Sequence, residues 1–157
     1  LSDKQPFDLT EQIRRCILLF ESKWEAKRLD LSVELEEISF SGNEDLLSQV
    51  WLNLIDNAVK FTHIGGSIGI RLFQADDGVR FVVRDDGCGI GEDQLAHIFD
   101  KFYQGDPSRS VSGNGLGLSV ALRIVELHGG KLECQSRENS GAEFTVVLPA
   151  PAAPKND

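Results

Sequence analysis

Four apolar residues near the N-terminus recur at i, i+4, i+7 and i+11, the spacing of one helix face: Ile13, Ile17, Phe20 and Trp24. This periodicity predicts an amphipathic helix from Thr10 to about Arg28, with Thr10 as its N-cap. We interpret the apolar stripe as a surface that packs on the core of the protein rather than as a binding site for a partner.

A second helical pattern spans residues 44–61 and has a distinctive polar side. Its apolar arc contains Leu47, Val50, Trp51, Leu54, Ala58 and Phe61. At about 100° per residue, Asn53, Asn57 and Lys60 fall within about 60° of one another beside that arc. Amide oxygens are ligands for hard metal ions, and amide and ammonium nitrogens bind phosphates. The polar side is therefore typical of a nucleotide–metal site, and the alternative interpretation is an ordinary solvated helix face.

Alternating apolar and polar runs predict the strands of the protein. They lie at residues 7–9, 31–35, 38–41, 67–73, 79–84, 131–136 and 143–148. Residues 75–78 carry a hairpin signal between two of these runs. A short helix is expected at residues 93–98, and a third long helix should end at Leu127, before two glycines.

The predicted strand at 79–84 leads directly into the sequence DDGCGI at residues 85–90. Gly87 and Gly89 allow the backbone to approach a ligand closely. A buried Asp85 carboxylate at the strand end can accept a hydrogen bond from the exocyclic amine of a purine. The alternative is a plain acidic glycine turn.

A second glycine-rich sequence, GNGLGL at residues 113–118, opens the third long helix. Backbone N–H groups at such a helix start can bind a phosphate. Its GxGxG spacing differs from the dinucleotide-binding fingerprint, and the chain contains no GxxxxGK[ST] loop. Phe99, Phe102 and Tyr103, followed by small and polar residues up to 114, predict a mobile loop with an aromatic hinge.

Composition limits the classes of function. The chain has 157 residues, 41% hydrophobic and 26% charged, which predicts a single soluble globular domain. It has no apolar run long enough to span a bilayer and no signal peptide, so we expect no membrane contact by this domain. Cys16, Cys88 and Cys134 are widely separated, which predicts reduced structural thiols rather than a zinc site. A formal net charge of −9 argues against nucleic-acid binding, and it means that a phosphate site needs a local cation and a metal ion.

Together and in this order, the four motifs resemble the ATP-binding catalytic domain of sensor histidine kinases. Residues 53–62 resemble the N box of that family, 85–90 its first glycine box, 99–102 its F box and 113–118 its second glycine box. The resemblance covers residues 7–149 and leaves 1–6 as a linker remnant and 150–157 as a flexible tail. It implies a two-layer α/β sandwich, the Bergerat fold shared with gyrase and heat-shock-chaperone ATPases. That fold has a mixed sheet of about five strands with three helices on one face.

The resemblance also implies roles for the polar residues of the N box. Asn57 would ligate the Mg²⁺ that bridges the phosphates of ATP, with Asn53 beside it and Lys60 facing the phosphate chain. ATP-hydrolysing relatives and serine-directed kinases of this fold carry Glu at the position of Asn53, where it acts as a general base. A neutral amide cannot take that proton, so Asn53 favours an acceptor that brings its own base, as a histidine imidazole does.

For the adenine and the remaining phosphate contacts, the resemblance points to the glycine boxes and the F box. Asp85 would bind the adenine amine, and Gly87 and Gly89 would let the ring enter. The other expected nucleotide-binding residues are Ile90, Lys101, Phe102, Arg109, Gly113, Gly115, Leu116, Gly117 and Leu118. Many family members carry Arg where this chain has Gln104, so a phosphate contact of the loop is either missing or supplied by Arg109.

The resemblance implies the catalytic domain of a cytoplasmic protein-histidine kinase (EC 2.7.13.3) of a two-component system. Its cofactors would be ATP and Mg²⁺, and its partners the dimerisation helices of the same kinase and the receiver domain of a response regulator. His63, His97 and His128 lack the acidic residue that follows the family's phosphoacceptor, so we expect the acceptor helix to lie outside this chain. Two alternatives remain: a nucleotide-binding regulatory module that docks to another kinase, and a hydrolytic ATPase of the same fold.

Overall fold

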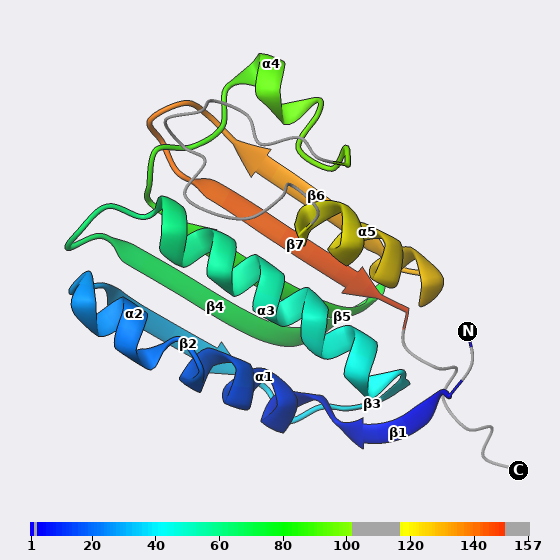
Figure 1. Cartoon of the computed structure of the whole chain (residues 1–157). Coiled ribbons are helices and arrows are strands. Elements are labelled where there is room, and N and C mark those ends of the chain that lie inside the picture. Colours follow the sequence, from blue (N-terminus) through cyan, green and yellow to red (C-terminus); the bar gives the residue numbers. More distant parts are fainter. Residues whose placement is uncertain (2, 102–116, 150–157) are drawn as a thin grey trace, which may run out of the picture.

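The computed structural model describes residues 1, 3–101 and 117–149, which form two layers (Figure 1). The helices are α1 Leu9–Leu18, α2 Glu21–Ala26, α3 Glu44–Phe61, α4 Glu92–Leu95 and α5 Gly117–Leu127. The strands are β1 Gln5–Asp8, β2 Asp30–Leu35, β3 Ser39–Gly42, β4 Ser67–Ala75, β5 Gly78–Asp85, β6 Lys131–Ser136 and β7 Ala142–Leu148. None of the helices in this part of the chain is long and apolar enough to cross a bilayer.

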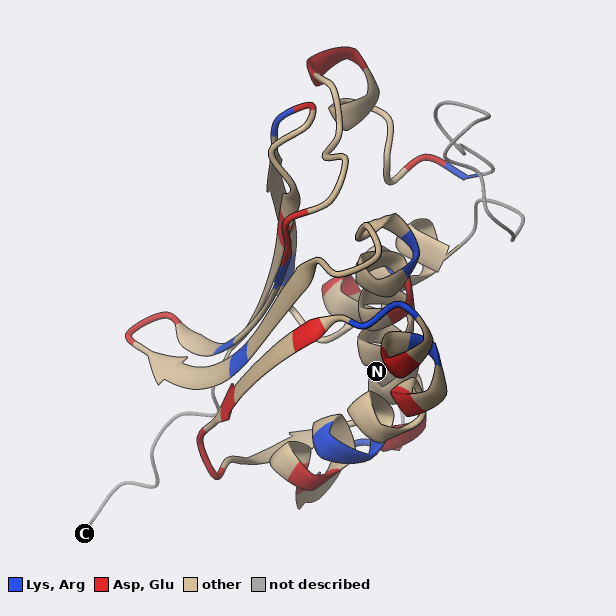
Figure 2. Cartoon of the chain, turned by 90° about the vertical axis from the view of Figure 1, so that its left-hand side faces the viewer, with Lys and Arg blue, Asp and Glu red and all other residues tan. Residues whose placement is uncertain are grey.

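The main sheet has five strands in the order β2-β4-β5-β7-β6. Only the β2–β4 pair is parallel, and the other neighbours are antiparallel, so the predicted mixed five-stranded sheet is confirmed. A separate two-stranded antiparallel sheet joins β1 to β3. Helices α1, α3 and α5 cover one face of the main sheet, whereas no described element covers the other face (Figure 2).

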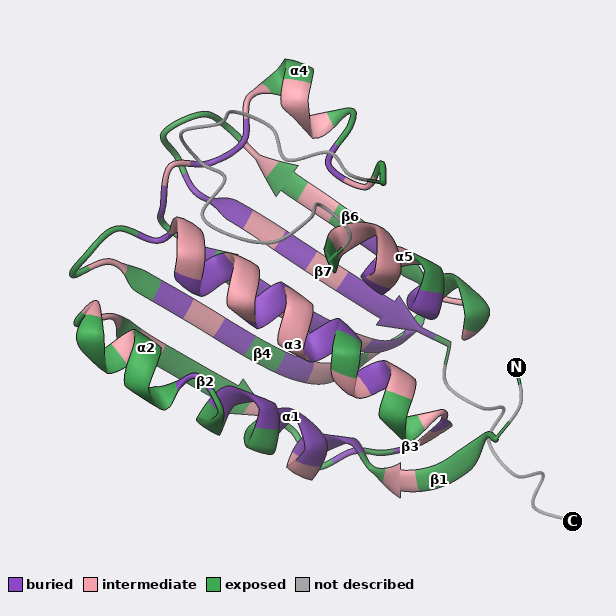
Figure 3. Ribbon diagram, viewed as in Figure 1, coloured by how far each residue is buried: buried purple, intermediate pink, exposed green. Residues whose placement is uncertain are grey.

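Helix α3 packs along the centre of the sheet and supplies much of the core (Figure 3). Its buried residues are Leu47, Val50, Trp51, Leu54, Ile55, Ala58 and Val59. The Trp51 ring lies 4.7 Å, centroid to centroid, from the Phe81 ring of β5. The apolar arc predicted from the sequence is thus confirmed except at Phe61, which is only half-buried at the end of the helix, and the buried face also includes Ile55 and Val59.

The single helix predicted for residues 10–28 is wrong in two respects. The chain forms two helices, because the backbone leaves helical geometry at Phe20, with φ −99° and ψ 7°. The N-cap is Asp8, whose side chain accepts a hydrogen bond of 3.0 Å from the Glu11 N–H. Thr10 is instead buried, and its hydroxyl accepts from the Ile38 N–H and donates to the Glu36 carbonyl, which joins α1 to the segment before β3.

Several smaller boundaries also differ from the sequence prediction. Strand β1 starts at Gln5, inside the expected linker, and β7 starts at Ala142. Helix α4 ends at Leu95 rather than at residue 98. Val33 is 41% exposed, whereas Leu31 and Leu35, at the equivalent alternating positions of the edge strand β2, are half-buried.

Candidate functional site

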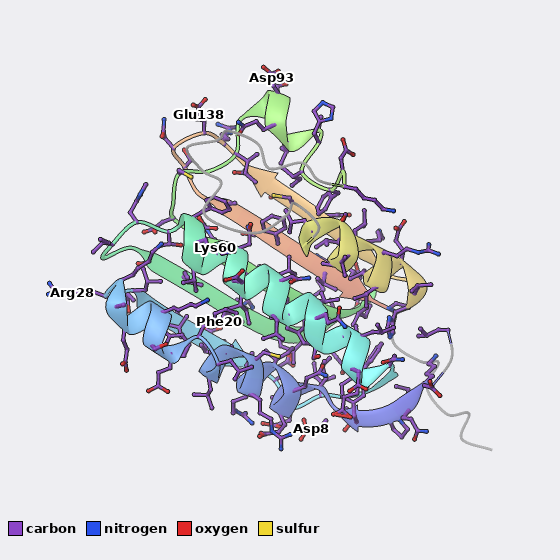
Figure 4. All side chains as sticks on the ribbon, in the orientation of Figure 1. Asp8, Phe20, Arg28, Lys60, Asp93 and Glu138 are labelled. Carbon is purple, nitrogen blue, oxygen red and sulfur yellow. The ribbon has the colours of Figure 1, made fainter. Side chains whose placement is uncertain are left out.

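The polar side of α3 carries the three residues expected to bind a nucleotide and a metal ion. Asn53, Asn57 and Lys60 are all half-buried. Figure 4 places Lys60 near the C-terminal end of α3, and its ammonium lies 2.9 Å from a carboxylate oxygen of Asp56. Asp56 was not among the predicted site residues, although an acidic residue four positions before a lysine on a helix is a recognisable ion-pair signal.

Asn53 connects α3 to the start of α5. Its side-chain nitrogen donates a hydrogen bond of 3.0 Å to the carbonyl of Gly117, the first residue of α5. The α3–α5 contact therefore holds this amide at the edge of the second glycine box. Because an amide has no basic atom at neutral pH, Asn53 is unable to activate a water molecule or a hydroxyl group.

Asp85 lies at the end of β5 and is only 4% exposed. One of its carboxylate oxygens accepts a hydrogen bond of 2.9 Å from the Gly87 N–H, which fixes the turn that leaves the strand. A carboxylate so deeply buried costs free energy unless it is hydrogen-bonded. Its place at a strand end, beside a glycine turn, makes it a candidate hydrogen-bond acceptor for a polar ligand.

The glycines of the first glycine box are required by the protein's own backbone. A Cβ on Gly87 would lie 2.0 Å from the Phe61 carbonyl oxygen at the end of α3. A Cβ on Gly89, whose φ is +68°, would lie 1.9 Å from the Arg137 carbonyl oxygen. The close approach that the sequence suggested toward a ligand is therefore, in this structure, an approach toward α3 and toward the β6–β7 hairpin.

The same hairpin holds the first glycine box from its other side. The Ile90 N–H donates to the Ser136 hydroxyl at 2.7 Å, and that hydroxyl donates to the Gly141 carbonyl at 2.7 Å. The Asn139 N–H donates to the Cys88 carbonyl at 2.6 Å. Residues 85–90 are thus fixed between α3 and the β6–β7 hairpin, which brings Asp85 and the last turn of α3 to one end of the molecule.

Two of the three thiols, those of Cys16 and Cys134, are poorly suited to nucleophilic chemistry. Burial raises the pKa of Cys16 to about 11. Burial, helped by the carboxylates of Asp85 and Glu143, raises the pKa of Cys134 to about 12. All three cysteines are free, as predicted, and Cys16 and Cys134 stay protonated at neutral pH.

The F box is described only in part. Phe99 packs edge-to-face on Phe144 of β7, with ring centroids 6.4 Å apart, and Lys101 is exposed. At the other end of the loop, Gly117 is exposed and Leu118 is half-buried against the core. The remaining predicted positions lie outside the described residues: Phe102, Tyr103, Gln104, Arg109, Gly113, Gly115 and Leu116.

The donor set on α3 fits a metal ion that arrives with a nucleotide. Among the described residues there is no group of three or more His, Cys, Asp or Glu side chains that could hold a metal ion by itself. Mg²⁺ commonly takes only one or two protein ligands and completes its shell with phosphate oxygens and water. The half-buried Asn57 amide supplies one hard oxygen of that kind.

Comparison with known proteins assigns the chain to a family. Residues 42–152 match the model described as histidine kinase-, DNA gyrase B- and HSP90-like ATPase. The heme sensor protein HssS of Staphylococcus saprophyticus is 37% identical over 140 residues, which are 89% of this chain and 30% of that protein. The chain belongs to this family of ATPases.

Solved structures show the same fold at similar levels of sequence identity. The catalytic domain of histidine kinase ThkA has a TM-score of 0.83 and 32% identity, over 94% of this chain and 96% of that one. ThkA in complex with the response regulator TrrA has a TM-score of 0.78 and 31% identity, over 94% and 42%. Full-length ShkA in complex with AMPPNP has a TM-score of 0.81 and 30% identity, over 98% and 33%.

The fold is therefore that of the catalytic domains of sensor histidine kinases, as the four boxes predicted. The chain spans about a third or less of the length of the curated relatives that it matches, for example 30% of HssS and 32% of the Escherichia coli kinase BaeS.

Proposed function

We propose that this chain binds Mg²⁺–ATP and donates the γ-phosphate to a histidine on a dimerisation helix outside the chain. The observation that carries the proposal is the junction between α3 and the first glycine box. At that junction the Phe61 carbonyl meets the Cys88 N–H at 3.4 Å and leaves no room for a Cβ on Gly87. It sets the amide and ammonium of α3 and the buried carboxylate of Asp85 at the same end of the sandwich.

Each side of this junction has a separate task. Asp85 accepts a hydrogen bond from the adenine amine, while the Asn57 amide oxygen ligates Mg²⁺ and the Lys60 ammonium approaches the phosphates. When bound, the metal ion would neutralise phosphate charge. The Lys60 ammonium is paired with Asp56, and the phosphates of a bound nucleotide would compete with Asp56 for it. The position of the Lys60 side chain would therefore depend on the bound nucleotide.

The chemistry of the acceptor follows from what α3 lacks. Phosphate transfer to water or to a hydroxyl group needs a base at the position of Asn53, and the Asn53 amide is occupied with the Gly117 carbonyl. An imidazole nitrogen carries its own lone pair and needs no such base. A histidine acceptor is therefore the one that this site supports best.

The partners of the proposed kinase are its dimerisation helices and a response regulator. ThkA, which shares this fold, has been solved with its response regulator TrrA, and ShkA has been solved with an ATP analogue. A place in the cytoplasm, where ATP and response regulators occur, is part of the same proposal.

The proposal is tested by nucleotide titration of the chain, followed by calorimetry with and without Mg²⁺. We expect ATP and ADP to bind, the affinity for ATP to rise with Mg²⁺, and GTP and GDP to bind at least about tenfold more weakly, since a guanine carbonyl cannot donate to Asp85. Equal affinities for ADP and GDP would remove the proposed role of Asp85. Failure to bind any nucleotide would remove the proposed function.

A further inference from the structure

The side chain of Lys27, just after α2, reaches across to the C-terminal end of α3. Its ammonium donates to the carbonyls of Val59, Lys60 and Thr62 at 2.7, 2.9 and 2.9 Å. Three donors meet three acceptors, so the hydrogen-bonding capacity of the ammonium is filled by one turn of backbone. The Lys27 carbonyl in turn accepts a hydrogen bond of 2.7 Å from the Gly65 N–H, just beyond α3.

These bonds complete the end of α3. The last four carbonyls of a helix have no partner within it and need one from outside. Here the Ala58 carbonyl accepts from the Thr62 N–H, and the Phe61 carbonyl accepts from the Cys88 N–H. Lys27 takes the two that remain, those of Val59 and Lys60.

The location of this cap matters because it lies in the last turn of α3, the turn that bears Lys60 and follows Asn57. In Figure 4, Lys60 marks that end of α3 and Arg28, the neighbour of Lys27, marks the end of the α2 segment at the same side of the molecule. A helix C-terminus carries about half a negative charge. Left uncapped, it would oppose a polyanion bound by the same turn, in a chain whose net charge is already −9.

We propose that Lys27 is a positioning residue of the nucleotide site. Its ammonium holds the last turn of α3 against the first glycine box and cancels the negative end of that helix where the phosphates bind. This inference rests on the proposed nucleotide-binding function. Lys27 acts through α3 and not by touching the nucleotide, so its contribution grows with the number of phosphates on the ligand.

The test compares Lys27→Met, which keeps an apolar stem and removes the charge, with Lys27→Arg, which keeps the charge and hydrogen-bond donors. Lys4→Met, at an exposed lysine before β1, is the matched control. AMPPNP, ADP and adenosine are titrated into each folded variant by calorimetry. For Lys27→Met we expect about tenfold weaker AMPPNP binding, a smaller loss for ADP and less than about threefold for adenosine.

The salt dependence and the Arg variant separate the positioning role from general damage to the fold. The AMPPNP deficit of Lys27→Met should shrink in about 0.5 M salt, because screening weakens the field of the uncapped helix end. Lys27→Arg should bind AMPPNP within about threefold of the parent, as should Lys4→Met. If Lys27→Met does not fold, Lys27→Gln, which keeps two donors without the charge, should show the same phosphate-dependent loss.

Two results would overturn the inference: a folded Lys27→Met or Lys27→Gln variant that binds AMPPNP like the parent, or one that loses equal affinity for all three ligands. Either result leaves nucleotide binding by the parent chain intact. Failure of the parent to bind AMPPNP and adenosine would instead remove the proposed function, whatever the variants do.

Discussion

Replacing Asp85 with Asn tests how the site recognises a base, with almost no change in shape. The asparagine oxygen can still accept the hydrogen bond that Asp85 receives from the Gly87 N–H at 2.9 Å, so the turn after β5 should survive. The substitution puts an amide nitrogen, a donor, on a side chain that previously only accepted. An adenine amine that approaches this side chain then meets a donor instead of a carboxylate.

The structure indicates a large effect on binding, because Asp85 is 4% exposed and water cannot readily replace a lost partner there. A hydrogen bond to a charged group contributes about 1.5–3 kcal/mol. The expected loss of ADP affinity for Asp85→Asn is therefore about 10- to 150-fold.

Calorimetric titration with ADP and Mg²⁺ measures this loss, and the thermal unfolding midpoint of each protein monitors the fold. Asp86→Asn is a matched control, since the exposed Asp86 carboxylate accepts from the Ser67 N–H on the β4 side and an asparagine oxygen can do the same. ADP affinity within about threefold of the parent, in a folded Asp85→Asn variant, would refute the assignment of Asp85 to the adenine.

Three further outcomes are expected. Asn57→Ala should abolish the gain in ATP affinity that Mg²⁺ gives and leave the unfolding midpoint nearly unchanged, and an undiminished gain in titrations with and without Mg²⁺ would contradict the metal assignment. His128→Phe removes the ring nitrogen that accepts from the Asn43 N–H at 3.0 Å and the one that donates to the Ile124 carbonyl of α5. The change should lower the free energy of unfolding in urea by about 1–3 kcal/mol. An unchanged urea midpoint would show that these two hydrogen bonds do not contribute to stability. Burial raises the pKa of Cys16 from 9.0 to about 11, so the folded state binds the thiol proton more tightly than the unfolded state does. The stabilisation that comes from this protonated thiol is complete below pH 9 and is lost as the pH rises from 9 to 11. Cys16→Val should flatten the decline of the unfolding free energy over that range, and an equally steep decline would refute the attribution.

The sequence was most informative where one short segment contains both an apolar helical periodicity and the polar residues that interrupt it. In residues 44–61 the apolar arc predicted the helix, and the amides and lysine that interrupt it marked the polar side. The fold was predictable because the N box, the first glycine box, the F box and the second glycine box occur along the chain in the order found in sensor histidine kinases. The two-stranded β1–β3 sheet was not predicted, because its short strands pair over more than 30 residues.

Other features depend on tertiary contacts that leave no local signal. The break between α1 and α2 falls at Leu19 and Phe20, and neither residue is a glycine or proline that would have predicted it. No sequence signal marks Lys27, since the carbonyls it binds are 32 to 35 residues away. The glycine at 87 was assigned to ligand access, whereas the nearest obstacle to a side chain there is the Phe61 carbonyl.

We propose above that this chain binds ATP as the phosphate donor and that the acceptor histidine lies on a helix outside it, and a phosphotransfer assay tests this most directly. The chain is incubated with γ-labelled ATP and Mg²⁺, alone and with a dimerisation-helix fragment that bears a histidine followed by an acidic residue. We predict no label on the chain alone, slow phosphate release, and an acid-labile phosphohistidine on the fragment, formed slowly because the separated pieces lack the effective concentration of a tether. Label on the chain alone, or rapid release of phosphate without the fragment, would contradict the account.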